Sequence, residues 1–149
     1  LHRFRRVTQI TEVRKEWEND PLTEGGFIDL MRYDSKQDEL VPTDELINGD
    51  SEIVKGIASQ IKEWVGDWPA IWDNILLRAK IKRTLVNYSE KYNIPDLLEA
   101  NDVIQMNDEF HRITDRVREE VGKLDSEKIF FEWENSLKRH IKKNYKVQL

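Results

Sequence analysis

The sequence predicts an α+β fold that is mainly α, in which short N-terminal antiparallel strands with a hairpin precede a bundle of about four helices. Before residue 49, apolar and β-branched side chains form short runs bounded by glycine, proline or aspartate, which is typical of strands. After residue 49, apolar side chains recur every three or four positions, which indicates helices. We therefore expect two domains, a strand segment over 1–48 and a helical domain over 49–149.

The composition excludes several kinds of site. The chain has 149 residues and no cysteine, so structural disulfides and thiolate metal ligands are excluded. A chain of this length can bury about two thirds of its unfolded surface and needs no metal to fold. No run of about 18 apolar residues occurs, so no membrane-spanning helix is expected. Residues 1–6 lack the apolar stretch of a signal peptide, and without an initiator Met we expect a fragment of a longer protein.

The net charge of -5 is concentrated in the middle of the chain. Residues 16–67 contain fourteen acids and four bases, whereas the segments on either side are net basic. Because phosphate contacts require clustered bases, the acidic block argues against nucleic acid as a general ligand. We interpret the block as a solvated acidic surface.

Residues 6–13 predict the first strand, because β-branched side chains suit extended backbone. Val7 and Val13 would share one face, and Ile10 would lie on the other. Apolar side chains on both faces are typical of a strand that is covered on both sides, and this is the expectation here.

Residues 27–34 and 39–41 predict a hairpin, joined by aspartate and serine residues that favour turns. Phe27, Met31 and Tyr33 alternate with side chains of the opposite face. Two or three strands make a poor sheet by themselves, so we expect helices or strands from elsewhere to complete it.

The first helix is expected to begin at Ser51 and to end at Gly66. A serine oxygen can accept from a free amide of the first turn, and glycine adopts the left-handed conformation at a helix end at little cost. The expected apolar face of this helix consists of Ile53, Ile57, Ile61 and Trp64.

Three further helices are expected over 69–92, 95–121 and 126–145. The first two begin at prolines, which are favoured in a first turn, and the third follows the capping residue Asp125. Their apolar stripes should pack together and bury most of the tryptophans. The stripes comprise Leu77, Ile81, Leu85, Tyr88 and Tyr92; Met106, Phe110, Ile113, Val117 and Val121; and Phe130, Trp133, Leu137, Ile141 and Tyr145.

Basic side chains on the helices expected over 69–92 and 126–145 are the candidate contact residues. In one interpretation they are solvated, with stems that cover apolar surface and charges that complement a helix dipole. In the other they contact an acidic partner, a phosphate or a membrane surface. The candidates are Arg78, Lys82, Arg83, Lys138, Arg139, Lys142 and Lys143.

No catalytic residue, cofactor-binding residue or metal ligand is assigned. Gly25-Gly26 is not followed by the Lys-Ser or Lys-Thr pair of a phosphate-binding loop, and His111 has no second histidine at helical spacing. No nucleophile elbow occurs either. His2 and His140 are expected at the surface.

Three segments share their order and spacing with one known family. The first is residues 5–13, which end in Ile10-Thr11-Glu12-Val13, and the second is the hairpin 27–34 followed by 38–42. The third comprises the helices that start at Gly49-Asp50-Ser51 and at Leu77-Arg78-Ala79. Over residues 4–90 the chain resembles the C-terminal end of archaeal type II/type IV secretion ATPases, which power pilus and archaellum assembly.

The resemblance implies a non-catalytic C-terminal domain. The family's nucleotide-binding lysine loop, acidic Mg²⁺ motif and aspartate and histidine boxes lie upstream of the matching region, so no family catalytic residue maps onto this chain. ATP and Mg²⁺ would be cofactors of the full-length protein, and none is expected in this part. The implied partners are the upstream motor core, neighbouring subunits and a membrane platform protein, with no nucleic acid. The implied location is cytoplasmic, with peripheral attachment at the inner face of the membrane.

Three other functions stay open at this point. A free-standing helical interaction module would bind a protein partner through Trp64, Trp68 and Trp72 if these rings are exposed together. A nucleic-acid-binding domain would use the basic helix expected over 69–92 and the basic end of the chain. The third is an enzyme whose site the motifs do not identify.

Overall fold

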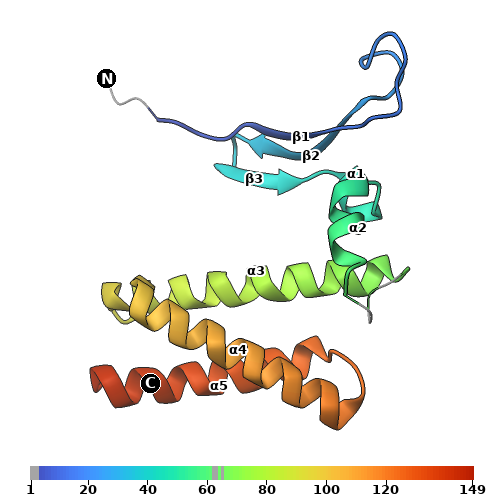
Figure 1. The fold of residues 1–149 in the computed structure, drawn as a ribbon. Helices are drawn as coiled ribbons and strands as arrows, with labels where there is room; N and C mark the ends of the chain where they lie inside the picture. Colours follow the sequence, from blue (N-terminus) through green and yellow to red (C-terminus); the bar gives the residue numbers. More distant parts are fainter. Residues whose placement is uncertain (1–3, 62–63, 65) are drawn as a thin grey trace. The chain divides into compact units, whose positions relative to one another are not determined.

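The computed structural model describes residues 4–61, 64 and 66–149, and it confirms an α+β fold that is mainly α (Figure 1). The chain divides into two compact units, here called unit 1 and unit 2, and each is described by itself. Unit 1 ends at Trp72 and unit 2 begins at Asp73. The boundary expected after residue 48 falls inside unit 1, because two short helices belong to the same unit as the strands.

Unit 1 contains a three-stranded antiparallel sheet in the order β1-β2-β3. Its strands are β1 (Gln9–Val13), β2 (Phe27–Asp34) and β3 (Glu39–Pro42), which confirms the expected hairpin. The turn of this hairpin holds Asp38 at a φ of 50°, a left-handed conformation that aspartate adopts more readily than most residues. The Asp38 carboxylate accepts from Arg6 Nε and from the Tyr33 hydroxyl, both at 2.7 Å, so the turn is fixed to the segment before β1.

A β-bulge interrupts the pairing of β1 with β2. Thr11 lies opposite Asp29, but Gln9, two positions earlier, lies opposite Arg32, three positions later. Strand β2 therefore contains one extra residue, Leu30, at this point. Because side chains alternate between the two faces of a strand, the extra residue brings Arg32 to the same face as Asp29.

The burial of β1 differs from the expectation. Val7, Ile10 and Val13 are all exposed, whereas Glu12 is only 3% exposed. The prediction of a strand covered by apolar contacts on both faces is therefore wrong. The alternation of the apolar residues marks the two faces correctly, but in unit 1 a carboxylate occupies the covered one.

Glu12 is buried because it caps a helix. Its Oε2 accepts from Ser51 Oγ at 2.5 Å, and its Oε1 accepts from the backbone amides of Glu52 at 3.0 Å and Ile53 at 3.4 Å. Amides in a first helical turn have no partner within the helix, so an acceptor from another element satisfies them. The contact joins β1 to the helix that follows residue 51.

Two short helices, α1 (Asp44–Asn48) and α2 (Glu52–Ala58), follow β3 and lie at one end of the sheet (Figure 1). The Thr43 hydroxyl caps α1 by accepting from the amide of Leu46 at 3.3 Å, and it donates to the carbonyl of Asp29 at 2.6 Å. Helix α1 has no counterpart among the expected helices, because five residues are too few to show a periodic stripe.

Helix α2 begins after Ser51 as expected but ends at Ala58, well before Gly66. Ile53 and Ile57 are 55% and 64% exposed, so the prediction that they form a buried face is wrong. Their spacing identifies a helical face correctly, but spacing does not show whether another element covers that face. Positions 62, 63 and 65 of the expected helix lie outside the described residues.

Unit 2 is helical (Figure 1). Helix α3 runs from Trp68 to Lys91 and enters unit 2 at Asp73. It is followed by the 3-10 helix η2 (Pro95–Leu98), by α4 (Ala100–Val121) and by α5 (Ser126–Tyr145). These bounds confirm the three expected helices, with a short break after η2 in the second of them. Asp125 caps α5 as predicted, accepting from the amide of Lys128 at 3.2 Å.

The apolar core of unit 2 is built around Trp133. This side chain is fully buried, and its indole Nε1 donates to the carbonyl of Met106 at 3.0 Å, so its one polar atom is satisfied. The stripes expected from the sequence supply most of the core. Its buried members are Leu77, Leu85, Ile94, Leu97, Met106, Phe110, Ile113, Val117, Ile129, Trp133, Leu137 and Ile141.

Most tryptophans are not buried in this core, contrary to the expectation. Trp64, Trp68 and Trp72 are half-buried in unit 1. The indole Nε1 of Trp68 donates to the carbonyl of Ile47 at 2.7 Å, and its ring stacks on that of Trp72 with centroids 6.1 Å apart. A methyl group added at Gly49 would meet the Trp68 ring at 2.7 Å, so this ring is held against the end of α1.

Candidate functional site

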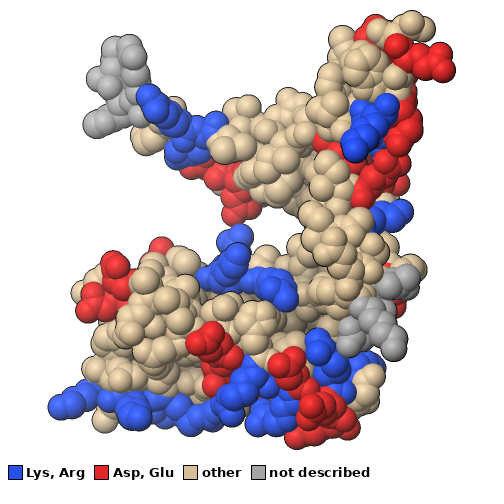
Figure 2. All heavy atoms as spheres, in the orientation of Figure 1, with Lys and Arg blue, Asp and Glu red and all other residues tan. Residues whose placement is uncertain are grey.

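The basic residues singled out in the sequence lie on two different helices of unit 2. Figure 2 shows one group of basic atoms over α3 and a separate row along the edge of the unit that α5 forms. The first group comprises Arg78, Lys82 and Arg83, and the second comprises Lys138, Arg139, Lys142 and Lys143. The structure therefore does not gather the candidates into one site.

The group on α3 is partly engaged in packing. Arg78 Nε donates to Asn74 Oδ1 at 2.8 Å, and the guanidinium lies 5.4 Å from the centre of the Phe110 ring. Lys80, which was not among the candidates, places its Nζ 3.9 Å from the centre of the Phe130 ring. Cations over aromatic faces stabilise the packing of α3 on its neighbours, which favours the structural interpretation for this group.

The second group is concentrated at the C-terminal end of α5. Together with Lys146 we call these residues the basic end of α5: Lys138, Arg139, Lys142, Lys143 and Lys146. Lys138 lies 3.6 Å from Glu134, and the charge of Arg139 acts on Glu109. Burial disfavours the charged form of Glu109, but hydrogen bonds from Arg112 and Ser136 and the charge of Arg139 together lower its pKa.

Lys142, Lys143 and Lys146 differ from the other two cations. Within residues 4–61, 64 and 66–149, none of these three ammonium groups forms an ion pair. All three are exposed, and α5 ends among them. Lys142 and Lys143 lie in the last turn of α5, where cations complement the helix dipole, whereas Lys138 and Arg139 lie before that turn.

A buried polar cluster fixes the end of α5 to the start of α4. The Tyr145 hydroxyl donates to Asp102 Oδ2, and His140 Nε2 lies 3.3 Å from the same oxygen. The hydrogen bond with Asp102, burial and the negative charge of that carboxylate raise the pKa of Tyr145 to about 12. The side chain of His140 is only 12% exposed, so the expectation that it lies at the surface is wrong. His111 is exposed, and His2 lies outside the described residues.

The sequence carries a signal for this cluster that the predictions did not use. Asp102 precedes Met106 by four positions and thus continues the apolar stripe of α4, where a carboxylate must have a partner. His140 lies next to the buried Ile141 at the other end of the contact. A polar residue in register with a buried stripe is therefore a candidate for a buried contact rather than a surface one.

Unit 1 carries a second candidate surface, which we call the open face of the sheet. Cross-strand partners share a face, and the pairs on this one are Thr11 with Asp29, Val13 with Phe27 and, beyond the bulge, Gln9 with Arg32. The opposite face carries Glu12, whose carboxylate contacts the start of α2, and Ile10, which is exposed.

A hollow of about 700 Å³ borders the open face and is lined by residues of β1, β2, the loop that joins them and α1. Asp29 lines the hollow, and its carboxylate accepts hydrogen bonds from Thr11 at 2.8 Å, from Arg32 at 2.8 Å and from Gln9 at 2.5 Å. The hydrogen bond from Thr11, then those from Arg32 and Gln9, lower the pKa of Asp29. The residues that line the hollow are Gln9, Thr11, Arg14, Leu22, Gly25, Phe27, Ile28, Asp29, Arg32 and Glu45.

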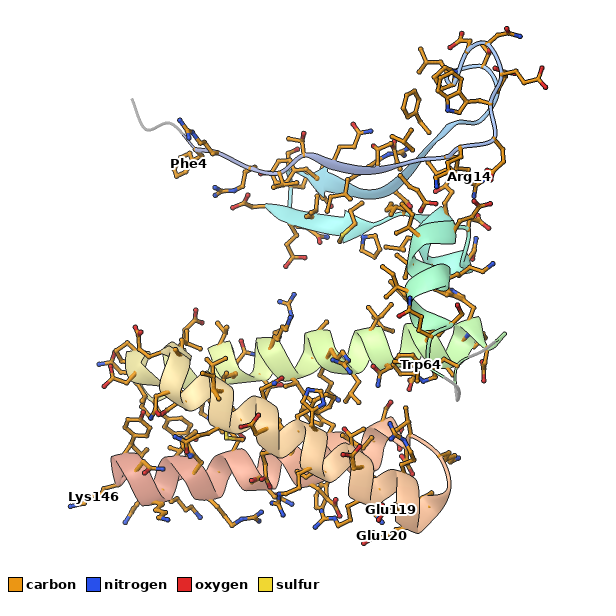
Figure 3. All side chains as sticks on the ribbon, viewed as in Figure 1. Phe4, Arg14, Trp64, Glu119, Glu120 and Lys146 are labelled. Carbon is orange, nitrogen blue, oxygen red and sulfur yellow. The ribbon has the colours of Figure 1, made fainter. Side chains whose placement is uncertain are left out.

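Arg14 connects this hollow with the helices of unit 1. Its Nη2 donates to the carbonyl of Asp50 at 2.5 Å, at the point where the chain enters α2 (Figure 3). Its Nε is buried and has no hydrogen-bond partner among the described residues. The hollow thus combines a neutralised Arg32–Asp29 pair with exposed apolar side chains, which suits contact with another protein surface better than binding of a free ion.

No group of three or more His, Asp or Glu side chains in the described part of the chain is arranged to hold a metal ion. Among those same residues, no helix combines the length and the apolar character needed to cross a lipid bilayer. Comparisons with protein-family models, with curated proteins and with solved structures found no match to this chain.

Proposed function

We propose that the chain is a non-catalytic C-terminal domain of an archaeal type II/type IV secretion ATPase and that it supports assembly of the motor through the open face of its sheet. The observation that carries the proposal is the exposure of apolar side chains on this face, around a hollow of about 700 Å³. Two of the three segments that resemble the family contain the strands that build this face.

The open face has the features of a protein contact. Val13 and Phe27 are exposed as a cross-strand pair, and such apolar surface gains free energy when a partner covers it. The Arg32–Asp29 pair beside them is already neutralised, so covering it leaves no uncompensated charge. A partner surface with an apolar projection would fill the hollow and bury both groups together.

β1 offers a further means of contact, because it is an edge strand of the sheet. The outer edge of such a strand presents backbone amides and carbonyls that can pair with a strand of another protein segment. In the proposed function the upstream motor core supplies that segment, and ATP and Mg²⁺ are bound there. Neighbouring subunits and a membrane platform protein are the further partners, in the cytoplasm.

The proposal is tested by mixing the purified chain with a motor core of this ATPase family that ends before the segment corresponding to β1. We expect association by isothermal titration calorimetry, and we expect Val13→Lys with Phe27→Lys to weaken it at least about tenfold, since two apolar side chains are lost from the contact. A matched control, Val103→Lys with Ile104→Lys, changes two exposed apolar residues of unit 2 and should leave the affinity unchanged.

Two results would count against the proposal. Equal affinities of the two double variants would show that the open face is not the contact. Hydrolysis of ATP by the purified chain, retained through chromatography, would contradict its non-catalytic role.

A further inference from the structure

Three side chains of α5 lie in one row on its solvent face, and Lys146, the left-handed residue that ends the helix, follows them. Phe131, Lys138 and Lys142 are spaced by seven and four positions, which places them within an arc of about 40° at about 100° per residue, and Lys146 comes four positions later. Phe131 is 66% exposed, an unusual position for an aromatic ring. The opposite side of the helix carries the fully buried core residues, so the row points away from unit 2.

The row is held on a rigid support. The indole of Trp133 fixes the middle of α5 through the carbonyl of Met106, and the hydroxyl of Tyr145 fixes its last turn through Asp102. Figure 3 shows Lys146 at the free end of α5, extended away from the helices of the unit. The four side chains can therefore meet a flat surface together without rearrangement of the backbone.

Charge along α5 is divided between its two ends. From Asn135 onward the chain contains five Lys or Arg residues and no Asp or Glu. The acids of α5 precede that point, and Glu132 is paired with Arg116 at 2.6 Å. Glu119 and Glu120 lie at the opposite end of the unit from Lys146 (Figure 3). Lys138 is paired with Glu134 at 3.6 Å, so the positive charge of the row that is left for a partner lies on Lys142 and Lys146.

The basic residues of the row are lysines, and this indicates which kind of acidic partner the row suits. Lysine is a compact, mobile point charge that suits a diffuse negative surface, whereas recognition of single carboxylates or phosphates favours the bidentate fork of arginine. The basic end of α5 has one arginine, and it already faces Glu109. Proteins that bind single-stranded nucleic acid follow the backbone with a charged groove, but this row lies on the convex face of a helix.

From these observations we propose that the solvent face of α5 binds the surface of a lipid bilayer that contains acidic headgroups. The lysines contact the headgroups, and Phe131 inserts its ring at the boundary with the acyl chains, as aromatic residues of interfacial helices do. The binding is peripheral and reversible, because one ring and a few lysines provide far less attachment than a spanning helix. The inference rests on unit 2 alone and does not depend on the proposed function.

The test is sedimentation of the full chain with vesicles. Phosphatidylcholine vesicles containing phosphatidylserine should bind it, and pure phosphatidylcholine vesicles should not. Each lysine next to an acidic membrane contributes roughly a five-fold factor in partition, so Lys142→Gln with Lys146→Gln should weaken binding about 25-fold. Phe131→Ser should weaken it several-fold at every salt concentration, whereas the effect of the lysine pair should shrink as salt is added.

The matched control is Lys82→Gln with Lys123→Gln, which removes the same charge from exposed positions outside the row. All the substituted side chains are exposed or point to solvent, and circular dichroism should show that each variant keeps the fold. Equal loss from both lysine pairs, binding independent of phosphatidylserine, or no binding at all would overturn the proposal. Tighter binding of single-stranded DNA than of the vesicles under the same salt would overturn it in favour of nucleic acid.

Discussion

The two units differ in how much apolar surface they bury. Among the described residues, the apolar side chains that are fully buried lie in unit 2, with Trp133 the largest, whereas the fully buried side chain of unit 1 is Ser51. Unit 2 is thus stabilised by apolar packing of helix on helix. Unit 1 buries a few apolar residues, such as Leu46 and Ile71, relies also on caps and charged hydrogen bonds such as that of Ser51 with Glu12, and leaves many large apolar residues on the surface.

This difference separates two ways in which a small unit can be stable. A unit with a closed apolar core is complete by itself, so any function must come from its exterior, such as the basic end of α5. A unit held together by polar contacts keeps its apolar surface for another molecule. The predictions that follow test this distinction, beginning with the largest expected effect.

Trp133→Ala should destabilise unit 2 by about 3–5 kcal/mol, because it leaves a large cavity and removes the hydrogen bond from the indole to the Met106 carbonyl. The free energy of unfolding from urea titration, followed by far-ultraviolet circular dichroism, measures the loss. Phe131→Ala, two positions away but exposed, should cost about 0.5 kcal/mol or less. Similar losses for both variants would contradict the closed core of unit 2.

Glu12→Ala should destabilise unit 1 by about 1–3 kcal/mol, since it leaves the Ser51 hydroxyl and the first amides of α2 without their acceptor. Hydrogen exchange of the amides of Glu52 and Ile53 reports the change locally and should become faster. Glu16→Ala, an exposed acid of the same segment, is the control and should not alter these rates. Unchanged exchange in Glu12→Ala would show that the polar contact does not stabilise unit 1.

Tyr145→Phe should cost about 1 kcal/mol near neutral pH, the usual net value of one hydrogen bond. The folded pKa of about 12 lies above the ordinary value of 10.0, so this stabilisation is fully present below pH 10.0 and is lost as the pH rises through about 12. The difference in unfolding free energy between the wild type and Tyr145→Phe should therefore shrink over that range. A difference that stays constant to pH 12 would contradict the assigned hydrogen bond.

Asp38→Asn should have the smallest effect, because Asp38 and its partner Arg6 are both exposed. The hydrogen bonds from Arg6 and Tyr33 lower the pKa of Asp38 to about 2 from an ordinary 3.8. Its contribution is present above about pH 4 and is lost as the pH falls through 2. Nuclear magnetic resonance of the β2–β3 turn should show the acid transition in the wild type and not in Asp38→Asn.

Most of the secondary structure could be predicted from periodicity. The hairpin and the helices α3, α4 and α5 follow from the spacing of apolar residues and from prolines and caps at their ends. The same rule failed at Ile53 and Ile57, because spacing identifies a face and gives no information about what covers it. The exposed apolar residues of β1 were misjudged for the same reason.

The surfaces were predicted less completely than the elements. The basic end of α5 could be located from its sequence, since consecutive cations on one helix share a region whatever the tertiary structure. The open face could not, because it depends on a bulge and on a contact between Glu12 and Ser51, which are 39 positions apart. The cluster of Asp102 with Tyr145 could be predicted in part. The position of Asp102 in the apolar stripe of α4 could be read from the sequence, but its partner Tyr145 could not.

The extra residue in β2 has a consequence for how such a sheet can change. In a strand of the same sequence without the bulge, every side chain beyond Leu30 would lie on the opposite face of the sheet. A deletion of Leu30 would remove the bulge and leave Asp29 and Arg32 two positions apart, so that regular alternation would still place both on one face. The Asp29–Arg32 pair is therefore compatible with two strand lengths, provided that the longer strand contains the bulge.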